Sequence, residues 1–74
     1  MNRMPVQSSN VASVGFEAGE EPDSGTLEVE FRSGHIYRYE GVPQSEYQAL
    51  AGASSVGKYM NSNIVGRYQE SRVK

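Results

Sequence analysis

The stretch at residues 25–43, GTLEVEFRSGHIYRYEGVP, limits the possible folds of this 74-residue chain more than any other part of it. Residues 27–32 alternate between apolar and charged side chains, which is the period-two pattern of a strand with one buried and one exposed face. Ser33 and Gly34 end that run, and the β-forming residues 35–39 follow. The stretch therefore predicts a β-hairpin on which the rest of the chain packs.

The length of the hairpin loop decides which side chains share a face. A two-residue loop places Tyr37 and Tyr39 on the exposed face, whereas a three-residue loop with Gly34 in the left-handed conformation pairs Val29 with Tyr37 and Leu27 with Tyr39. We prefer the three-residue loop, because it gathers the apolar side chains on one face. The core face then carries Leu27, Val29, Phe31, Tyr37 and Tyr39, and the open face carries Glu28, Glu30, Ile36 and Arg38.

The segments before the hairpin complete the predicted sheet. Residues 1–7 are expected to form a loose end, and residues 8–17 read as a first strand. The core face of that strand carries Ala12, Val14 and Phe16. Residues 19–25 predict a turn, because they combine two glycines, a proline and three acidic residues.

Two helices are predicted after the sheet. Pro43 suits the first turn of a helix, where its missing N–H group costs nothing, and Gly52 suits the C-terminal cap. Ser54 or Ser55 can cap a second helix, which is expected to weaken near Asn61. The apolar stripes consist of Tyr47, Leu50 and Ala51 in the first helix and of Val56, Tyr59, Met60, Ile64 and Tyr68 in the second.

These elements predict an α+β fold, a three-stranded antiparallel β-meander followed by two helices packed on one sheet face (β-β-β-α-α). The chain is short enough for a single domain, over residues 1–74, with an ordered core at about residues 6–68.

The composition narrows the classes of protein to which the chain can belong. It contains no cysteine, so neither disulfides nor thiolate metal sites are expected. It shows no apolar run of membrane-spanning length and no signal-peptide pattern, and we expect a cytoplasmic monomer without membrane contact. Residues 1–57 carry three arginines and eight acidic residues, whereas residues 58–74 carry four basic residues and one acidic residue. The body of the domain is thus acidic and its tail basic.

No combination of residues predicts catalysis. Residues 52–58, GASSVGK, have the spacing of a phosphate-binding P-loop, but Tyr59 stands where that motif needs Ser or Thr for magnesium, and a helix precedes the run. His35 is the only histidine, so a paired-histidine metal site cannot form. Glu28 and Glu30 share a face, but solvated glutamates opposite a core are the commoner arrangement. We predict a protein that is not an enzyme and that holds no cofactor or metal.

Aromatic and basic side chains give the pattern that points most directly to a ligand. Tyr37 and Tyr39 could stack on nucleic-acid bases if the sheet face were exposed, although the preferred register makes them core residues. Lys58 and Arg67 belong to the basic tail, which forms either a phosphate-contacting stripe or a solvated helix end favoured by the helix dipole.

Short motifs occur in a fixed order along the chain: Val6-Gln7-Ser8-Ser9, Val14-Gly15-Phe16, Leu27-Glu28-Val29-Glu30-Phe31, Gly34, Tyr37-Arg38-Tyr39, Val42-Pro43, Ala53-Ser54-Ser55-Val56-Gly57-Lys58-Tyr59 and Asn61. In this order they resemble the KTSC domain, a family named for its occurrence at the C-terminus of some lysyl-tRNA synthetases. The resemblance covers about residues 6–68. It implies a small stand-alone bacterial protein of an uncharacterised family, for which the synthetase fusions suggest RNA binding. It supplies no catalytic residue and does not imply aminoacylation.

The leading hypothesis is therefore a small non-enzymatic module that binds RNA. The expected nucleic-acid-binding residues are Arg38, Lys58, Arg67, Tyr37 and Tyr39. The alternative is a protein–protein interaction module that uses the open sheet face or an edge strand, with Ile36 exposed among charges. A third hypothesis is a small-molecule pocket between the sheet and the helices.

Overall fold

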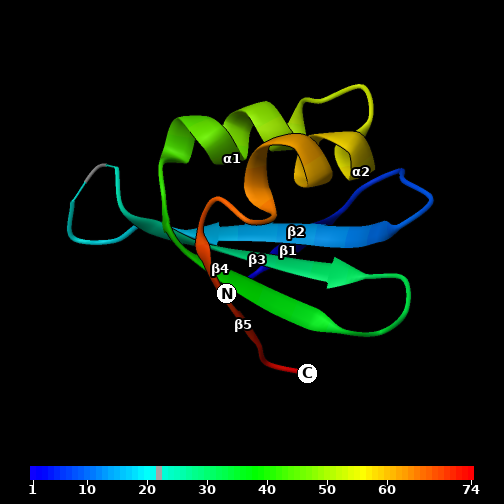
Figure 1. Ribbon diagram of the computed structural model, residues 1–74, viewed down its shortest axis with the longest axis horizontal. Coiled ribbons are helices and arrows are strands. Elements are labelled where there is room, and N and C mark those ends of the chain that lie inside the picture. The colour runs from blue at the N-terminus through cyan, green and yellow to red at the C-terminus, as the bar shows by residue number, and fades with distance from the viewer. Residues whose placement is uncertain (22) are drawn as a thin grey trace.

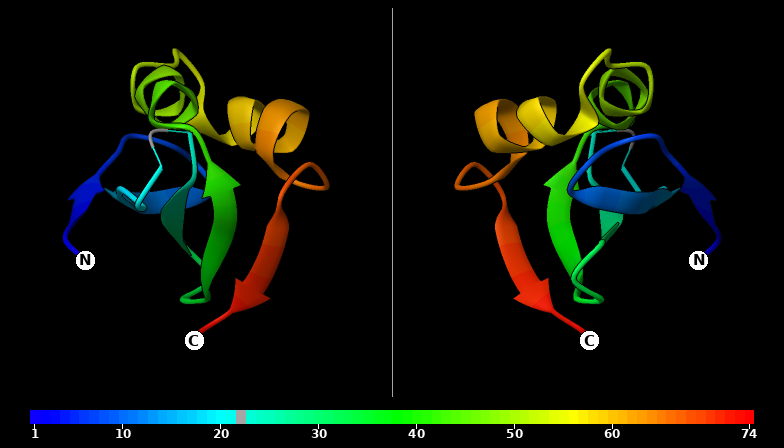
Figure 2. Two further views of the ribbon diagram at one scale, coloured as in Figure 1. Left: turned by 90° about the vertical axis from the view of Figure 1, so that its left-hand side faces the viewer. Right: turned by 90° about the vertical axis from the view of Figure 1, so that its right-hand side faces the viewer.

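The computed structural model describes residues 1–21 and 23–74 and shows an antiparallel sheet with helices on one face (Figures 1 and 2). The five strands lie in the order of the chain: β1 (Arg3–Pro5), β2 (Val11–Glu17), β3 (Gly25–Phe31), β4 (Ile36–Val42) and β5 (Gln69–Arg72). Between β4 and β5 come α1 (Gln44–Ala51), α2 (Val56–Tyr59) and a π-helical segment, η1 (Met60–Ile64). The predicted turn at residues 19–25 includes Pro22, which lies outside the described residues.

The central hairpin has the predicted register. Leu27 pairs with Tyr39 and Val29 pairs with Tyr37, which confirms the three-residue loop. Gly34 has a φ of +97°, and its N–H group donates to the Phe31 carbonyl at 2.9 Å. An L-residue rarely adopts this backbone conformation, so the glycine fixes the loop and, through it, the register.

The prediction of three strands is wrong, because the sheet has five. β1 adds to the outer edge of β2, and β5 adds to the outer edge of β4. Both added strands are short, and all four residues of β5 are exposed. They are held mainly by backbone hydrogen bonds to the meander and not by an apolar face, and the alternation that marks a half-buried strand is therefore missing from their sequences.

Gly15 allows β1 to lie close to β2. A Cβ atom at Gly15 would stand 2.5 Å from the carbonyl oxygen of Asn2, which is closer than real Cβ atoms approach. We expect Gly15→Ala to displace β1 and to lower the free energy of unfolding by about 2 kcal/mol, the usual scale for overpacking. Urea unfolding followed by circular dichroism measures this change.

Gly57→Ala is the matched control for that substitution. The Cβ atom at Gly57 would lie 3.5 Å from Ser8 Oγ, an ordinary contact, and alanine favours the helix by up to about 1 kcal/mol relative to glycine. We therefore expect Gly57→Ala to leave the stability unchanged or raised. Equal stability of Gly15→Ala and the wild type would contradict the close approach.

The first strand differs from the prediction in one core position. Val14 is fully buried and Phe16 packs partly buried against the core, as expected. A β-bulge between Val11 and Ser13, however, makes Val11 the next buried residue, whereas Ala12 stays partly exposed. The bulge inserts a residue into the strand, so that strict alternation fails there.

The helices begin and end close to the predicted residues, with one exception. Gly52 is the C-cap of α1, and Ser55 caps α2 by accepting a hydrogen bond from the Lys58 N–H group at 3.3 Å. The helix changes to π-helical geometry at Met60, next to the predicted weak point. Gly66, with a φ of +82°, then turns the chain, so the expectation that the helix reaches Tyr68 is wrong.

The core lies between the sheet and the helices. Its buried members come from three strands (β2, β3 and β4) and all three helical segments: Val11, Val14, Leu27, Val29, Tyr39, Val42, Leu50, Val56, Met60 and Ile64. Ile36 is only 8% exposed, and its backbone pairs with the C-terminal residues: the Val73 N–H group donates to the Ile36 carbonyl at 2.8 Å. The expectation of an exposed Ile36 is therefore wrong.

Candidate functional site

The five residues expected to bind nucleic acid lie on different parts of the structure. Lys58 is exposed on α2, and Arg67 is exposed in the turn after η1. Arg38 lies on the open sheet face, where its Nε atom donates to Glu28 at 3.0 Å. Tyr37 is partly buried, and Tyr39 is only 2% exposed beneath the helices. The five residues therefore do not form one surface.

The open sheet face is organised around Glu28, which is 4% exposed although no helix covers it. Its two carboxylate oxygens accept hydrogen bonds from Arg3 at 2.5 Å and from Arg38 at 3.0 Å. Burial alone would raise the pKa of Glu28, but the hydrogen bonds from Arg38 and Arg3 outweigh burial and hold the pKa below its usual value. Arg3 also donates to Ser13, which donates to Glu30. This polar network ties β1 to the middle of the sheet.

Glu46 ties the helices to the segment before β5. Its carboxylate accepts hydrogen bonds from the Tyr59 and Tyr68 hydroxyl groups, the latter at 2.9 Å. The pKa of Tyr59 is raised chiefly by its hydrogen bond to Glu46, and the pKa of Tyr68 is raised chiefly by burial. These three side chains thus join α1, α2 and the turn after η1, a structural role.

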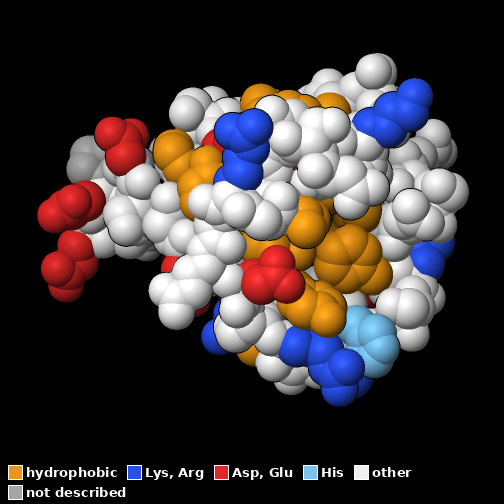
Figure 3. Space-filling view, in the orientation of Figure 1, with side chains coloured by type: hydrophobic (Ala, Val, Ile, Leu, Met, Phe, Trp, Pro, Cys, Tyr) orange, Lys and Arg blue, Asp and Glu red, His pale blue; other side chains and the backbone are white. Residues whose placement is uncertain are grey.

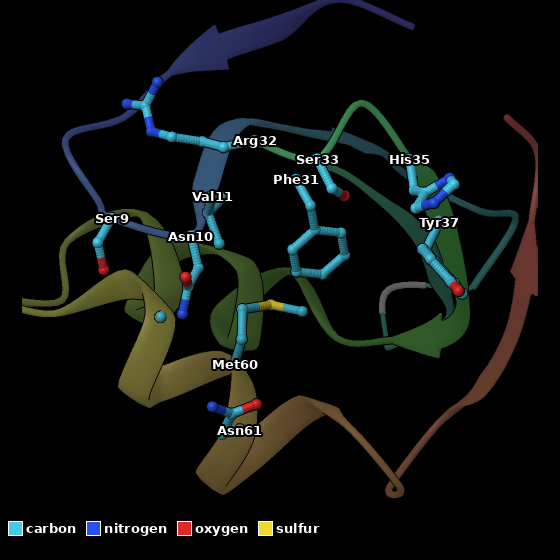
Figure 4. A pocket seen from close by; sticks show the side chains of 11 residues that line it. Ser9, Asn10, Val11, Phe31, Arg32, Ser33, His35, Tyr37, Met60 and Asn61 are labelled. Atoms are coloured by element: carbon cyan, nitrogen blue, oxygen red, sulfur yellow. The ribbon is translucent and has the colours of Figure 1, made fainter.

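A hollow of about 400 Å³ opens at the end of the sheet where the β3–β4 hairpin, the β1–β2 loop and α2 meet (Figure 4). Phe31 and Tyr37 form one wall, with their ring centroids 5.8 Å apart and their planes at 83°. Val11 and Met60, which belong to the buried core, complete the apolar part of its lining. The polar lining residues are Ser9, Asn10, Arg32, Ser33, His35 and Asn61.

A second hollow of about 250 Å³ adjoins the first and shares Ser9, Asn10, Gly57 and Asn61 with it. The other residues of its lining are Gln7, Ser8, Ser54, Ser55, Val56 and Lys58. We refer to the two hollows together as the end groove. The smaller hollow is its polar half, and the larger hollow is its partly apolar half.

Local hydrogen bonds shape the loop that borders the end groove. Ser8 Oγ accepts from the N–H groups of Asn10 and Val11, both at 3.2 Å, which folds the β1–β2 loop into a turn. Arg32 holds this loop to the hairpin: its Nε donates to the Ser8 carbonyl at 2.7 Å and its N–H group to the Asn10 carbonyl at 2.8 Å. Two segments far apart in the sequence, the β1–β2 loop and the β3–β4 hairpin, are thereby fixed beside each other at the groove.

The charges of the two ends of the molecule differ in sign. Acidic side chains gather on the β2–β3 loop at the left of Figure 3, whereas the histidine and a patch of hydrophobic side chains lie on the other side. Arg32, His35 and Lys58 border the end groove, and its described lining includes no Asp or Glu. An anionic ligand is therefore favoured at this end of the molecule.

Within the part of the chain that the structure describes, no group of three or more His, Cys, Asp or Glu side chains is placed to hold a metal ion. Among the same residues, no helix is long and apolar enough to cross a membrane.

Of the five residues expected to bind nucleic acid, Lys58 and Tyr37 line this groove, whereas the lining residues Asn10, Phe31 and Arg32 are not among those five. The alternation of residues 27–32 places Phe31 on the core face, and single Asn and Arg residues in loops carry no periodic signal. The P-loop-like run at residues 52–58 is a helix–helix turn, and most of it lines the polar half of the groove.

The fold and the groove define a small α+β domain in which one face of a five-stranded antiparallel sheet is covered by helices. Within this class the chain belongs to the KTSC domain family, whose sequence profile matches residues 7–68. The crystal structure of a KTSC domain protein from Yersinia pestis is similar, with a TM-score of 0.86 and 33% sequence identity, covering 99% of this chain and 97% of that one.

Two relatives place the domain in different contexts. An uncharacterized protein from Stutzerimonas stutzeri is 46% identical over 61 residues, which are 82% of this chain and 80% of the relative. A lysine–tRNA ligase from a Nostoc species is 41% identical over 49 residues, which are 66% of this chain but only 9% of the ligase. The family resemblance noted in the sequence is thus confirmed.

Proposed function

We propose that this protein is a non-enzymatic domain that binds RNA in the end groove. The observation that carries the proposal is the combination, in one depression, of a partly exposed aromatic pair with a basic border and no acidic lining residue. Aromatic faces stack on bases and basic side chains neutralise phosphates, which together are the usual means of binding single nucleic-acid strands. The relative named as a lysine–tRNA ligase adds support, because that enzyme acts on tRNA.

The groove offers binding groups and not a catalytic set. Its lining consists of amides, hydroxyl groups, aromatic rings and positive charges, and His35 has no carboxylate or thiol beside it among the described lining residues. Such groups orient and hold a ligand, whereas acid–base catalysis needs a positioned partner for the histidine.

Of the expected binding residues, the proposal keeps Lys58 and Tyr37 and adds Phe31 and Arg32. Arg38 is left out because Glu28 already neutralises it on the open face. That face offers less to a protein partner than the sequence predicted, because the Glu28 network occupies it and Ile36 is covered.

The test of this proposal is a charge reversal at Lys58. We expect Lys58→Glu to weaken the binding of a short mixed-sequence RNA about tenfold at low salt, measured by fluorescence anisotropy, and the wild-type affinity to fall as salt is added. Arg67→Glu is the matched control, because it makes the same charge change at an exposed residue outside the groove lining.

We expect Arg67→Glu to weaken RNA binding by no more than about threefold, because it changes only the electrostatic potential of the whole protein. Equal losses for the two variants would place the RNA elsewhere on the basic tail. Wild-type protein that binds no RNA at low salt would refute the proposed function.

A further inference from the structure

We propose that the larger hollow of the end groove receives one unpaired nucleobase, so that the domain selects single-stranded over double-helical RNA. This inference rests on the proposed function and goes beyond it by naming the form of the nucleic acid and the position of one base.

The shape of the hollow favours a base that has left its stack. Its volume of about 400 Å³ lies at the lower end of the range for small-ligand sites, about 300–1,000 Å³. In an RNA duplex the bases are stacked inside the helix, and proteins reach mostly the 2′-hydroxyl and phosphate groups across a shallow minor groove. A concave pocket cannot enclose a base in that state, whereas a single strand can turn a base outward into it.

The aromatic wall has room for one planar ring. The planes of Phe31 and Tyr37 stand at 83°. A base that stacks on the face of one ring is therefore nearly perpendicular to the other ring and contacts it edge to face. The corner therefore suits one base that stacks on one ring and contacts the other. Met60 and Val11 also line the hollow, but both are buried, so contact with the base is left to the two rings.

Polar groups stand at the border that the two hollows share. Asn10 and Asn61 come from the β1–β2 loop and from η1, and both line both hollows (Figure 4). A side-chain amide offers a donor and an acceptor, which is what the Watson–Crick edge of an unpaired base requires. These two residues are therefore placed to hold the edge of the inserted base.

The smaller hollow provides a path for the sugar and phosphate that adjoin the base. It adjoins the larger hollow through four shared lining residues, it is lined mainly by hydroxyl and amide groups, and Lys58 contributes the positive charge. A nucleotide with its base against Phe31 and Tyr37 can thus place a neighbouring phosphate near Lys58. The two halves of the groove match the two chemically different halves of a nucleotide.

The experiment compares an eight-nucleotide RNA with a duplex of the same sequence, using fluorescence anisotropy at low salt. We expect the wild type to bind the single strand at least tenfold more tightly than the duplex. Phe31→Leu should reduce single-strand affinity about tenfold and leave duplex affinity within about twofold, because it keeps apolar volume but removes the stacking face.

Phe16→Leu is the matched control. Phe16 is also a partly buried phenylalanine of the sheet and stacks on Tyr47 at 5.2 Å, but it does not line the groove. It should leave both affinities unchanged. If Phe31→Leu fails to fold by thermal melting, the exposed Asn61→Ala variant takes its place, with an expected loss of about fivefold for the single strand.

Three results separate this inference from the proposed function. Base insertion would be overturned by equal affinity for the single strand and the duplex. It would also be overturned if neither Phe31→Leu nor Asn61→Ala changed the single-strand affinity. In both cases, a loss of binding in Lys58→Glu would still support the groove as an RNA site. Binding of neither RNA would overturn both. Intermolecular NOEs between base protons and the Phe31 ring would support the inference directly.

Discussion

Replacing Tyr39 with alanine is expected to remove most of the stability of the folded domain. Tyr39 is among the largest fully buried side chains and packs on β4 beneath the helices, opposite Leu27 of β3. Truncating a buried aromatic residue typically costs about 3–5 kcal/mol, because transfer energy is lost and a cavity remains. A domain of this size has a total stability of only about 4–11 kcal/mol, so the variant should be largely unfolded or close to it at 37 °C.

Tyr39→Phe is the control that separates the ring from its hydroxyl group. The substitution keeps the aromatic volume, and we expect a change of no more than about 1 kcal/mol at pH 7. Urea unfolding monitored by circular dichroism gives both values. A Tyr39→Ala variant as stable as the wild type would show that the ring is not part of the core.

The same residue predicts how stability changes at high pH. Burial raises the pKa of Tyr39 to about 12, whereas the unfolded chain titrates near 10. The folded state thus holds the phenolic proton more tightly, and its stability is complete below pH 10 and is lost as the pH rises towards 12. Tyr39→Phe should therefore lose less stability than the wild type between pH 10 and 12. The loss that remains in this variant is caused by Tyr59 and Tyr68, whose pKa values are also raised.

The burial of Tyr39 bears on function as well. A ring that is 2% exposed cannot offer its face to a base, so we expect Tyr39→Phe to bind RNA with the wild-type affinity. Of the two tyrosines in the Tyr37-Arg38-Tyr39 motif, Tyr37 lines the end groove and Tyr39 is part of the core. The two positions share a sheet face but differ in what covers them.

The parts of the fold that local chemistry determines could be predicted from the sequence. The hairpin register follows from alternation and from Gly34, and the helix caps at Gly52 and Ser55 follow from residue type. The two added strands could not be predicted, since RMP and QESR have no apolar pattern and pair only because the meander exposes edges to them. A strand of this kind is specified by its neighbours and not by its own residues.

The candidate site was harder to predict than the fold for a similar reason. The end groove combines the β1–β2 loop, the hairpin and α2, and it forms only when the chain has folded. Asn10 and Arg32 lie in loops, where a single polar residue is ordinary and carries no signal of a site. Phe31 was expected in the core, and its partial exposure results from its place at the end of β3, next to the hairpin loop.

Replacing Glu28 with glutamine is expected to destabilise the domain by about 2 kcal/mol at pH 7, and this loss of stability should shrink as the pH falls. The substitution keeps the shape of the side chain but leaves the guanidinium groups of Arg3 and Arg38 without their counter-charge. Breaking a fully buried ion pair costs about 3–5 kcal/mol, and the cost here is smaller because Arg38 is 46% exposed and can turn to solvent.

Glu40→Gln is the matched control for this effect. Glu40 is exposed on β4, which pairs with the strand β3 that carries Glu28. The Glu40 carboxylate accepts a hydrogen bond from the Thr26 hydroxyl group at 2.6 Å. An exposed carboxylate contributes little, so we expect a change below about 0.5 kcal/mol. Amide hydrogen exchange should also become faster in β1 of Glu28→Gln alone, because Arg3 is the side chain that joins this strand to the network.

The pH dependence distinguishes lost charge from altered packing. The pKa of Glu28 lies below its usual value in the folded state, so the carboxylate stabilises the fold above the unfolded-state pKa of about 4.5 and loses this effect as the pH falls through the folded-state pKa. The difference in unfolding free energy between the wild type and Glu28→Gln should therefore be full at pH 7 and vanish once Glu28 is protonated. A difference that persists undiminished at pH 2 would mean that packing, and not the charge held between two arginines, accounts for the contribution of Glu28.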